Sequence, residues 1–340
     1  MKTKSFTLIE ILVALVILGI LSTFIIISLS NVVDSANDVK RKKDLDSISK
    51  ALMEYRIMTG SYPEETSDCN IGDGTCLDEL INYEYAKEFP LDPSGDRYKY
   101  TSDGITYTIK ATLSDGQILA YSPDTGYSTI LPFVCGTSTV TFTYKGSSVT
   151  YGTVNSPTGK CWLDRNLGAT QVALSSTDAN AYGDLFQWGR LDDGHQVRTS
   201  GTTSTRSTTD VPGHGDFITY GSSPYDWRNP QNNNLWQGVS GTNNPCPTGF
   251  RIPTQTELNA ERLTWSSNNS AGAFASTLKL TVAGLRYRDD GSIGSVGTYG
   301  SYWASVITST SSYYLYFNSS SADTGTYSRA YGLSVRCIKD

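Results

Sequence analysis

Histidine is almost absent from this sequence of 340 residues, and no two cysteines stand in a C-x-x-C spacing. The only histidines are His195 and His214. Zinc centres are usually built from closely spaced cysteine and histidine ligands, so these absences argue against one. No metal site is predicted from ligand spacing.

Basic residues are also scarce, with 27 Lys and Arg against 33 Asp and Glu, a net charge of -6 and a pI near 5.1. Proteins that hold nucleic acid by bulk electrostatics carry basic surfaces, so no nucleic-acid partner is expected. Most of the chain is poor in charge and rich in Ser, Thr, Gly, Asn and Tyr. That composition is typical of an extracellular, β-rich protein.

The chain has six cysteines, which allow fifteen pairings, and sequence spacing alone does not choose among them. Without metal-type spacing, an even number of cysteines favours an exported, oxidised chain with three disulfides. The cysteines are Cys69, Cys76, Cys135, Cys161, Cys246 and Cys337.

Residues 6–29 form one long apolar run in which Glu10 is the only ionisable side chain. As a helix this run would rise about 36 Å, enough to cross a hydrocarbon core of about 30 Å. Lys2 and Lys4 precede it and should hold the amino terminus in the cytoplasm. A cleaved secretory signal would have a shorter apolar region and an Ala-x-Ala site. A plain membrane anchor would leave Glu10 unexplained, because a charge in hydrocarbon costs roughly 2.5 kcal/mol or more.

The segment from Ser5 to Glu10 resembles the class III signal of type IV pilins and type II secretion pseudopilins. The resemblance implies a leader of residues 1–5, cleaved between Ser5 and Phe6 by a prepilin peptidase that then methylates Phe6. The family usually has Gly where this chain has Ser5. Residues 6–31 are then expected to be the membrane-spanning helix of the precursor and the core helix of a filament.

Charge pairing gives Glu10 a role in such a filament. After cleavage, the Phe6 ammonium group is buried among apolar helices, where an unpaired charge is costly. A Glu10 carboxylate from a neighbouring copy can neutralise it and so fix the axial register between subunits. The expected partners are other copies of the chain, the prepilin peptidase and the assembly machinery of the inner membrane.

Residues 32–131 are expected to form a pilin-like domain, with an amphipathic helix against a small antiparallel sheet of three or four strands. Four apolar residues recur at three- and four-residue spacing, which indicates a helix: Leu45, Ile48, Leu52 and Tyr55. Residues 60–63 should end it by Gly and Pro chemistry. Residues 106–111 and 117–121 alternate as strands, and residues 44–65 and 89–93 resemble pseudopilin sequences.

Two polar features of this domain leave alternatives open. The basic run 40–43 would either contact anionic lipid headgroups or be a solvated helix segment outside the membrane. Asp73 lies in a loop between Cys69 and Cys76, a pair expected to form a disulfide. Asp73 would either contribute to a calcium site, as in some pseudopilins, or serve as ordinary turn chemistry. No other cofactor is expected.

Residues 132–340 are expected to form a separate surface domain. Four segments, 160–169, 244–254, 302–305 and 332–340, together resemble the Fibrobacter succinogenes major paralogous domain family. This family is related to C-type-lectin-like and formylglycine-generating-enzyme folds. The resemblance implies an irregular α+β domain with long loops, small sheets and short helices. It also implies two disulfides, Cys135–Cys161 and Cys246–Cys337.

Catalysis is not expected, because all cysteines have structural partners and both histidines are interpreted as solvated loop residues. Sugar binding is a further expectation: Tyr225, Trp227, Trp236 and the strand 313–317 are candidate stacking faces, although alternate residues of that strand must face the core. The two tryptophans are equally suited to anchor the polar segment 196–243 to the domain. Asn268 and Asn318 stand in sequons that would accept glycans.

The sequence as a whole predicts an α+β structural subunit, not an enzyme. It would be a membrane precursor that assembles into an extracellular type IV pilus-like filament, polymerised by its helix and displaying a large surface domain for adhesion. The alternative is a minor pilin or pseudopilin that presents an adhesin module for a carbohydrate or a protein.

Overall fold

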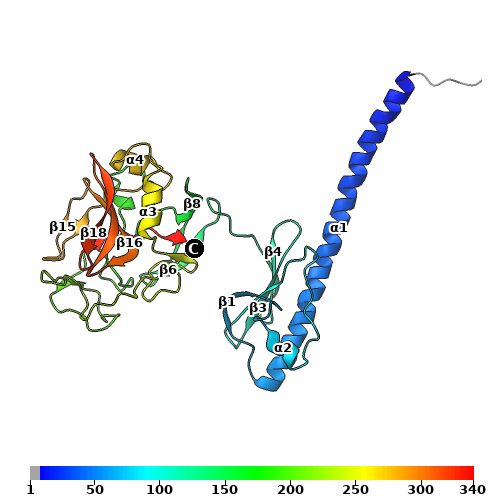
Figure 1. Ribbon diagram of the computed structural model, residues 1–340, viewed down its shortest axis with the longest axis horizontal. Coiled ribbons are helices and arrows are strands. Elements are labelled where there is room, and N and C mark those ends of the chain that lie inside the picture. Colours follow the sequence, from blue (N-terminus) through cyan, green and yellow to red (C-terminus); the bar gives the residue numbers. More distant parts are fainter. Residues whose placement is uncertain (1–7) are drawn as a thin grey trace, which may run out of the picture. The chain divides into compact units, whose positions relative to one another are not determined.

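The computed structural model describes the backbone of residues 8–340, and their side chains from Val32 onward. The chain divides into two compact units, Met1–Phe133 and Val134–Asp340 (Figure 1). Each unit combines helices with sheets in which antiparallel pairing predominates, and this α+β mixture is what the sequence predicts.

The first unit is dominated by α1 (Leu8–Thr59), a helix of 52 residues, which corresponds to about 78 Å (Figure 1). Among its described side chains, from Val32 onward, Leu45, Ile48 and Leu52 in the carboxy-terminal half are at most 1% exposed. The helix ends where Gly60 adopts a φ of 92° and donates its N–H to the Arg56 carbonyl, a glycine cap that residues with a Cβ rarely form. In the part of the chain described here, no helix is long and apolar enough to cross a membrane.

A five-stranded antiparallel sheet packs on this half of α1, one or two strands more than predicted. Its strands follow one another in space as they do in sequence: β1 (Glu65–Asn70), β2 (Lys99–Ser102), β3 (Tyr107–Thr112), β4 (Ile118–Ser122) and β5 (Gly126–Ile130). The additional pairing arises because the chain turns back after β4 and forms a hairpin with β5. Tyr100 and Ile109 are fully buried against the helix residues, and the short helix α2 (Asp78–Asn82) adds Leu80 to this core.

The second unit contains several small sheets rather than one large one. The first four-stranded sheet comprises β10 (Phe186–Gln187), β19 (Gly332–Leu333), β14 (Leu285–Arg286) and β15 (Ile293–Gly294). The second comprises β13 (Phe250–Arg251), β20 (Ile338–Lys339), β9 (Cys161–Leu163) and β8 (Thr153–Asn155). The three-stranded sheet comprises β16 (Gly300–Thr308), β17 (Ser311–Phe317) and β18 (Ala322–Ser328). Two-stranded sheets pair β6 (Val140–Tyr144) with β7 (Ser147–Tyr151) and β11 (Thr202–Thr203) with β12 (Phe217–Ile218).

The helices of the second unit are short: η1 (Ala179–Ala181), α3 (Gln255–Arg262) and α4 (Ser270–Ala275). A capping box starts α3, because the Thr254 hydroxyl accepts from the Glu257 N–H while the Glu257 carboxylate accepts from the Thr254 N–H. The core is rich in tryptophan, and Trp162, Trp188 and Trp303 are fully buried. Because the strands are short, large aromatic side chains supply much of the apolar area that holds the unit together.

Three disulfides connect the six cysteines: Cys69–Cys76, Cys135–Cys161 and Cys246–Cys337. These are the pairs expected above. The first closes a loop within the first unit, and the third joins positions 91 residues apart within the second.

Candidate functional site

The predicted processing and assembly residues lie at the start of the chain. Ser5 and Phe6 fall outside the described residues, and so does the side chain of Glu10, whose backbone belongs to α1. The first described side chains follow at Val32. Here α1 is exposed all round, from position 32 to position 36.

Apolar side chains remain uncovered on this stretch of helix. Val32 is 63% exposed, Val33 51% and Val39 68%. Val32 and Val39 are seven residues apart and therefore lie on nearly the same helix face. The turn between β3 and β4 contacts this part of α1, where Ser114 bonds to Asp34 and Asp38, yet the three valines stay largely uncovered within the first unit.

Arg41 is the first buried residue among the described side chains of α1, and its guanidinium holds the helix to two other segments. Its Nε and Nη2 donate to Asp92 Oδ2 and Oδ1 at 2.7 and 2.8 Å, a two-pronged pair. Its Nη1 donates to Asp38 Oδ1 at 2.6 Å and to Ser114 Oγ at 2.9 Å. We call Arg41, Asp92, Asp38 and Ser114 the Arg41 clasp.

The electrostatics of the clasp favour the charged pair. Burial alone would raise the pKa of Asp92, but hydrogen bonds from Arg41 and Ser94 bring it below its ordinary value. The run 40–43 was expected to be solvated or at lipid headgroups, and for Arg41 both alternatives are wrong. Arg41 is 6% exposed, because carboxylates 3 and 51 residues away enclose it. Lys42 and Lys43 remain exposed.

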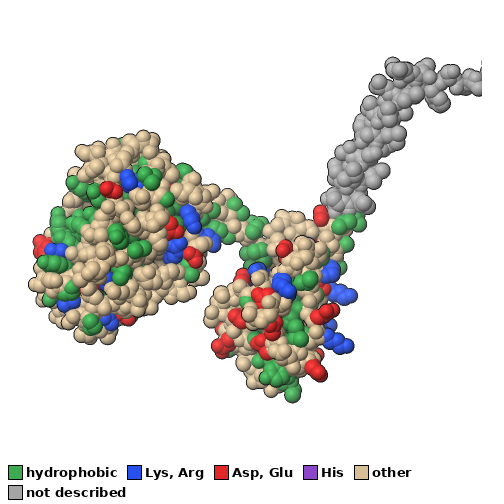
Figure 2. Space-filling view, in the orientation of Figure 1, with side chains coloured by type: hydrophobic (Ala, Val, Ile, Leu, Met, Phe, Trp, Pro, Cys, Tyr) green, Lys and Arg blue, Asp and Glu red, His purple; other side chains and the backbone are tan. Residues whose placement is uncertain are grey.

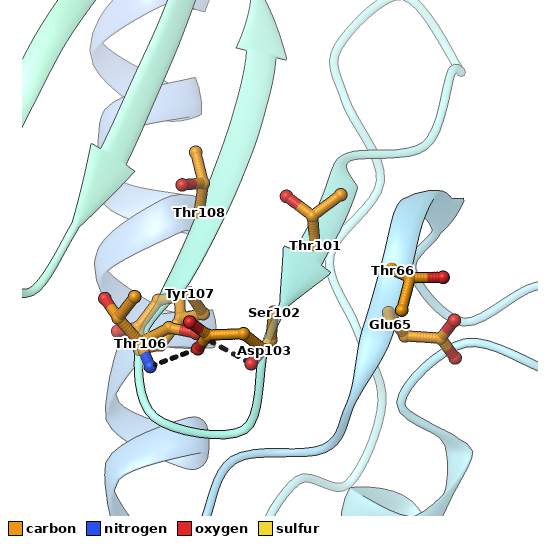
Figure 3. A pocket seen from close by; sticks show the side chains of 8 residues that line it. All are labelled: Glu65, Thr66, Thr101, Ser102, Asp103, Thr106, Tyr107 and Thr108. Carbon is orange, nitrogen blue, oxygen red and sulfur yellow. Dashed lines mark hydrogen bonds between the residues drawn. The ribbon is translucent and has the colours of Figure 1, made fainter. Parts of the chain in front are cut away.

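A shallow pocket of about 410 Å³ opens on the sheet beside β1, β2 and β3 (Figure 3). Hydroxyl groups dominate its lining, which consists of Glu65, Thr66, Thr101, Ser102, Asp103, Thr106, Tyr107 and Thr108. The Asp103 carboxylate is occupied by its own turn, because Oδ1 accepts from the Ile105 and Thr106 N–H groups, both at 2.9 Å. The lining therefore offers polar contacts but no pair of free acids for acid–base chemistry.

The Asp73 carboxylate organises the Cys69–Cys76 loop. Its Oδ1 accepts from the Thr75 N–H, the Thr75 hydroxyl and the Cys76 N–H, at 2.8 to 3.2 Å. Across the described residues, no group of three or more His, Cys, Asp or Glu side chains is placed to hold a metal ion. Calcium binding at Asp73 stays a prediction.

The interpretation of His195 as a solvated loop residue is wrong. Its side chain is fully buried, Nε2 accepts from the Gln187 N–H at 3.0 Å, and Nδ1 donates to Asp193 Oδ1 at 2.6 Å. Burial lowers the pKa of His195 to about 3, despite the opposing effect of Asp193, so the ring is neutral. The polar sequence around His195 did not reveal that Asp193 and the backbone would supply both of its partners.

The structure also corrects the proposed stacking faces. Trp227 and Trp236 are at most 1% exposed, and their indole N–H groups donate to the carbonyls of Trp188 and Arg190. They are anchors of the polar segment, so they present no face to a ligand. Tyr225 is partly exposed and lies 4.0 Å from the Arg288 guanidinium, measured to the ring centroid.

The two sequon asparagines differ in their contacts. Asn268 accepts from Arg262 Nη1 at 2.6 Å and donates to the Ala322 carbonyl at 2.8 Å, so both ends of its amide are engaged. Asn318 Oδ1 accepts from the Ser320 and Ser321 N–H groups. Glycosylation of either residue stays a prediction.

Helix α3 carries two glutamates in opposite environments. Glu261 is fully buried, and neither of its carboxylate oxygens has a hydrogen-bond partner among the described residues. Burial raises the pKa of Glu261, and the nearby Ser156 and Arg336 offset this only in part. In Glu257, burial is outweighed by hydrogen bonds from Arg251 and Thr254, which lower the pKa to about 2.

These shifts predict opposite effects of pH on stability. The folded state keeps the Glu261 proton at a pH where the unfolded chain, with a pKa near 4.3, has lost it. The stability contributed by protonated Glu261 is thus lost as pH rises through the folded pKa. We expect Glu261→Gln to raise the free energy of unfolding by about 1–3 kcal/mol at pH 8 and to flatten the fall in this free energy that wild type shows as pH rises above about 4.3. Urea unfolding followed by tryptophan fluorescence measures both.

Glu257→Gln is the matched control on the same helix. Because the pKa of Glu257 is lowered, its stabilisation is present above about pH 4.3 and disappears as pH falls through the folded pKa. This variant should therefore lose stability at pH 8. If Glu261→Gln and wild type show the same pH slope, the buried carboxyl does not titrate as described.

A long amino-terminal helix followed by a small antiparallel sheet, with a processing motif at the start, is the arrangement of pilin-like filament subunits. Residues 1–26 match the prokaryotic N-terminal methylation motif, and residues 28–119 match the family described as type II secretion system (T2SS), protein G. The chain belongs to the type II secretion system core protein G family. Both matches fall within the first unit.

Individual relatives support this assignment. The type II secretion system core protein G of Vibrio cholerae is 35% identical over 130 residues, covering 34% of this chain and 84% of that protein. The Aeromonas hydrophila and Pseudomonas aeruginosa proteins of the same description are 32% and 33% identical over 108 residues, each covering 30% of this chain and 76% of the relative. No solved structure matches the chain.

Proposed function

We propose that this protein is a pseudopilin-type filament subunit whose amino-terminal helix polymerises and whose second unit is displayed on the filament. The observation that carries the proposal is the helix itself. A methylation motif matches its first part, its exposed valines lie ahead of the Arg41 clasp, and the sheet packs on its carboxy-terminal half.

The proposed cycle starts with a precursor in the plasma membrane, held by residues 6–31. Prepilin peptidase cleaves after Ser5 and methylates Phe6, and the subunit then leaves the membrane for a filament on its outer side. Membership of the secretion-system family favours a pseudopilus as the form of this filament. An extracellular pilus would be a longer polymer of the same subunit. The Phe6 ammonium group of one subunit pairs with Glu10 of the next, which keeps both charges compensated in an apolar bundle.

Loss of Glu10 tests this role. We expect Glu10→Ala to reduce the filament fraction by about tenfold or more while leaving membrane insertion unchanged, because the Phe6 ammonium loses its partner but the helix stays apolar. The measurement is the ratio of pelleted filaments to membrane-bound subunit, with mass spectrometry of the assembled amino terminus.

Glu54→Ala is the control, since Glu54 is exposed on the same helix within the first unit. It should assemble like wild type. Normal filament yield from Glu10→Ala, or Met1 retained in assembled material, would overturn the proposed pairing or processing.

For the second unit we propose a C-type-lectin-like fold without catalysis, serving as a binding module. Its disulfides, small sheets and tryptophan anchors support a rigid scaffold that presents loops and strands to the outside. Adhesion to a carbohydrate or a protein is the second candidate function, favoured by partly exposed tyrosines on the three-stranded sheet.

A further inference from the structure

Five tyrosine rings form a continuous series on the second unit. Tyr314 and Tyr316 alternate along β17 with Leu315 and Phe317, which are fully buried on the other face. Successive ring centroids are 4.2 to 6.3 Å apart in the order Tyr316, Tyr314, Tyr327, Tyr331, Tyr287. We call these five residues the tyrosine row.

The row lies at the border of the core. Tyr314 pairs across the sheet with the buried Trp303, yet every member of the row remains partly exposed. Figure 2 shows side chains of the hydrophobic class, which includes Tyr, gathered on the surface over β15 and β18. Four of the five rings, all but Tyr316, pack against this core, and their partial exposure leaves part of each ring within reach of a ligand.

The absence of a side chain at one position of the edge strand leaves space for two of these rings. Gly325 of β18 stands opposite Tyr314, and a Cβ there would lie 3.0 Å from Tyr314 Cε1 and 3.5 Å from Tyr316 Cε1. Tyr314 and Tyr316 stack at 5.5 Å with 29° between their planes. A side chain at position 325 would force these rings to shift.

Arg288 extends the row to Tyr225. Its guanidinium lies 5.0 Å from the Tyr331 ring centroid and 4.0 Å from that of Tyr225, and Nη1 donates to Ser328 Oγ at 2.8 Å. The Arg288 side chain is 20% exposed and lies 3.4 Å from the more exposed Asp289 carboxylate. Tyr225, which unlike Trp227 and Trp236 is not buried, thus belongs to the same surface.

The chemistry of this surface fits an uncharged, hydroxylated ligand. Ring faces match the C–H faces of sugars, while phenol and Ser or Thr hydroxyls match their hydroxyl groups. Burial and the neighbouring Tyr331 raise the pKa of Tyr327 to about 12, so its hydroxyl stays a neutral donor. On β17 and β18 the only charged side chain is Asp323, and Arg288 is balanced by Asp289, so neither a polyanion nor a polycation is favoured.

We propose that the tyrosine row, with Arg288 and Tyr225, binds a neutral oligosaccharide. This inference rests on the proposed function in one respect, namely that the second unit is displayed where it meets glycans. The row would act as a platform for successive sugar rings, and Arg288 would donate to hydroxyls at one end.

Calorimetric titration of the detergent-solubilised full chain tests the proposal. The probes are cellohexaose, xylohexaose, laminarihexaose and chitohexaose, with polygalacturonate and heparin as charged comparisons. We expect at least one neutral probe to bind in a salt-independent manner. Tyr316→Ala and Arg288→Gln should each weaken that binding about tenfold, whereas Tyr316→Phe should retain it.

Tyr83→Ala is the matched control, because Tyr83 is a 67% exposed tyrosine of the first unit, outside the row. Hydrogen exchange of the second unit must be the same in wild type and in every variant that is compared. If Tyr316→Ala fails to fold, Arg288→Gln still tests the proposal, with Tyr316→Phe as the conservative comparison. Absence of binding to all neutral probes, binding only to the charged polymers, or equal affinity in Tyr316→Ala, Arg288→Gln and wild type would overturn the proposal. Glu10→Ala should leave sugar binding intact, which separates this result from a failure of filament assembly.

Discussion

Replacing Arg41 with Met is expected to lower the free energy of unfolding of the first unit by about 3–5 kcal/mol. The change removes one partner of a buried ion pair and leaves the Asp92 carboxylate, 7% exposed, without its guanidinium. Asp38 and Ser114 lose the same partner, so the helix, the loop after position 88 and the turn between β3 and β4 are released together.

The measurement is urea unfolding of the detergent-solubilised full chain, with hydrogen exchange read separately from peptides of β2–β4 and of the second unit. Lys50→Met is the control, since it removes the same charge from an exposed position of α1 and should change stability by less than about 0.5 kcal/mol. The difference between Arg41→Met and wild type should shrink below about pH 4. Because the pKa of Asp92 is lowered in the folded state, the stabilisation from its carboxylate is lost as pH falls through that pKa. If Arg41→Met lowers the free energy of unfolding by less than about 1 kcal/mol at pH 7, the Arg41 clasp positions these segments but contributes little to stability.

Removing the Cys246–Cys337 disulfide should have a comparable effect on the second unit. The bond closes a loop of 91 residues, for which the chain-entropy relation gives about 4–5 kcal/mol. We expect the double variant Cys246→Ala, Cys337→Ala to unfold at a correspondingly lower urea concentration in the second unit alone. Tryptophan fluorescence reports this directly, because every tryptophan of the chain lies in that unit.

The Cys69–Cys76 bond provides the comparison within the same chain. Its loop spans only 7 residues, so Cys69→Ala, Cys76→Ala should cost about 2 kcal/mol, and only in the first unit. Equal losses from the two double variants would argue that local packing, rather than loop closure, sets the contribution of these bonds.

The local sequence pattern predicted the helices and strands that depend on residues close together in the chain. The three- and four-residue spacing of Leu45, Ile48 and Leu52 indicated a helix with one buried face, and Gly60 marked its end. Alternation indicated β3 and β4 to within one residue. The sheet was underestimated, because the pairing of β1 and β5 depends on turns and partners that the alternation of either strand does not reveal.

Burial of polar groups was the least predictable feature. His195 and Glu261 stand in polar sequence, yet both are fully buried. His195 bonds to Asp193 and a backbone N–H, whereas the Glu261 carboxylate has no hydrogen-bond partner among the residues that the structure describes. Trp227 and Trp236 could have faced a ligand or the core, and only the packing of the unit decided for the core. Residue type fixes what a side chain can bond to, but its neighbours fix whether water is excluded from it.

The sequence by itself determined that residues 6–29 are a long apolar run with Glu10 as its only ionisable side chain, within a processing motif, since those properties depend on residues close together in the chain. It also determined the family, which the matches at positions 1–26 and 28–119 establish. The tertiary structure alone decided that Arg41 is enclosed rather than solvated, and that tyrosines from β17, β18 and the segments after β14 and β18 form one surface. The physical reason is the same in both cases: each arrangement depends on contacts such as Arg41–Asp92 and Tyr287–Tyr331, which join residues more than 40 positions apart, and only the folded chain brings these residues together.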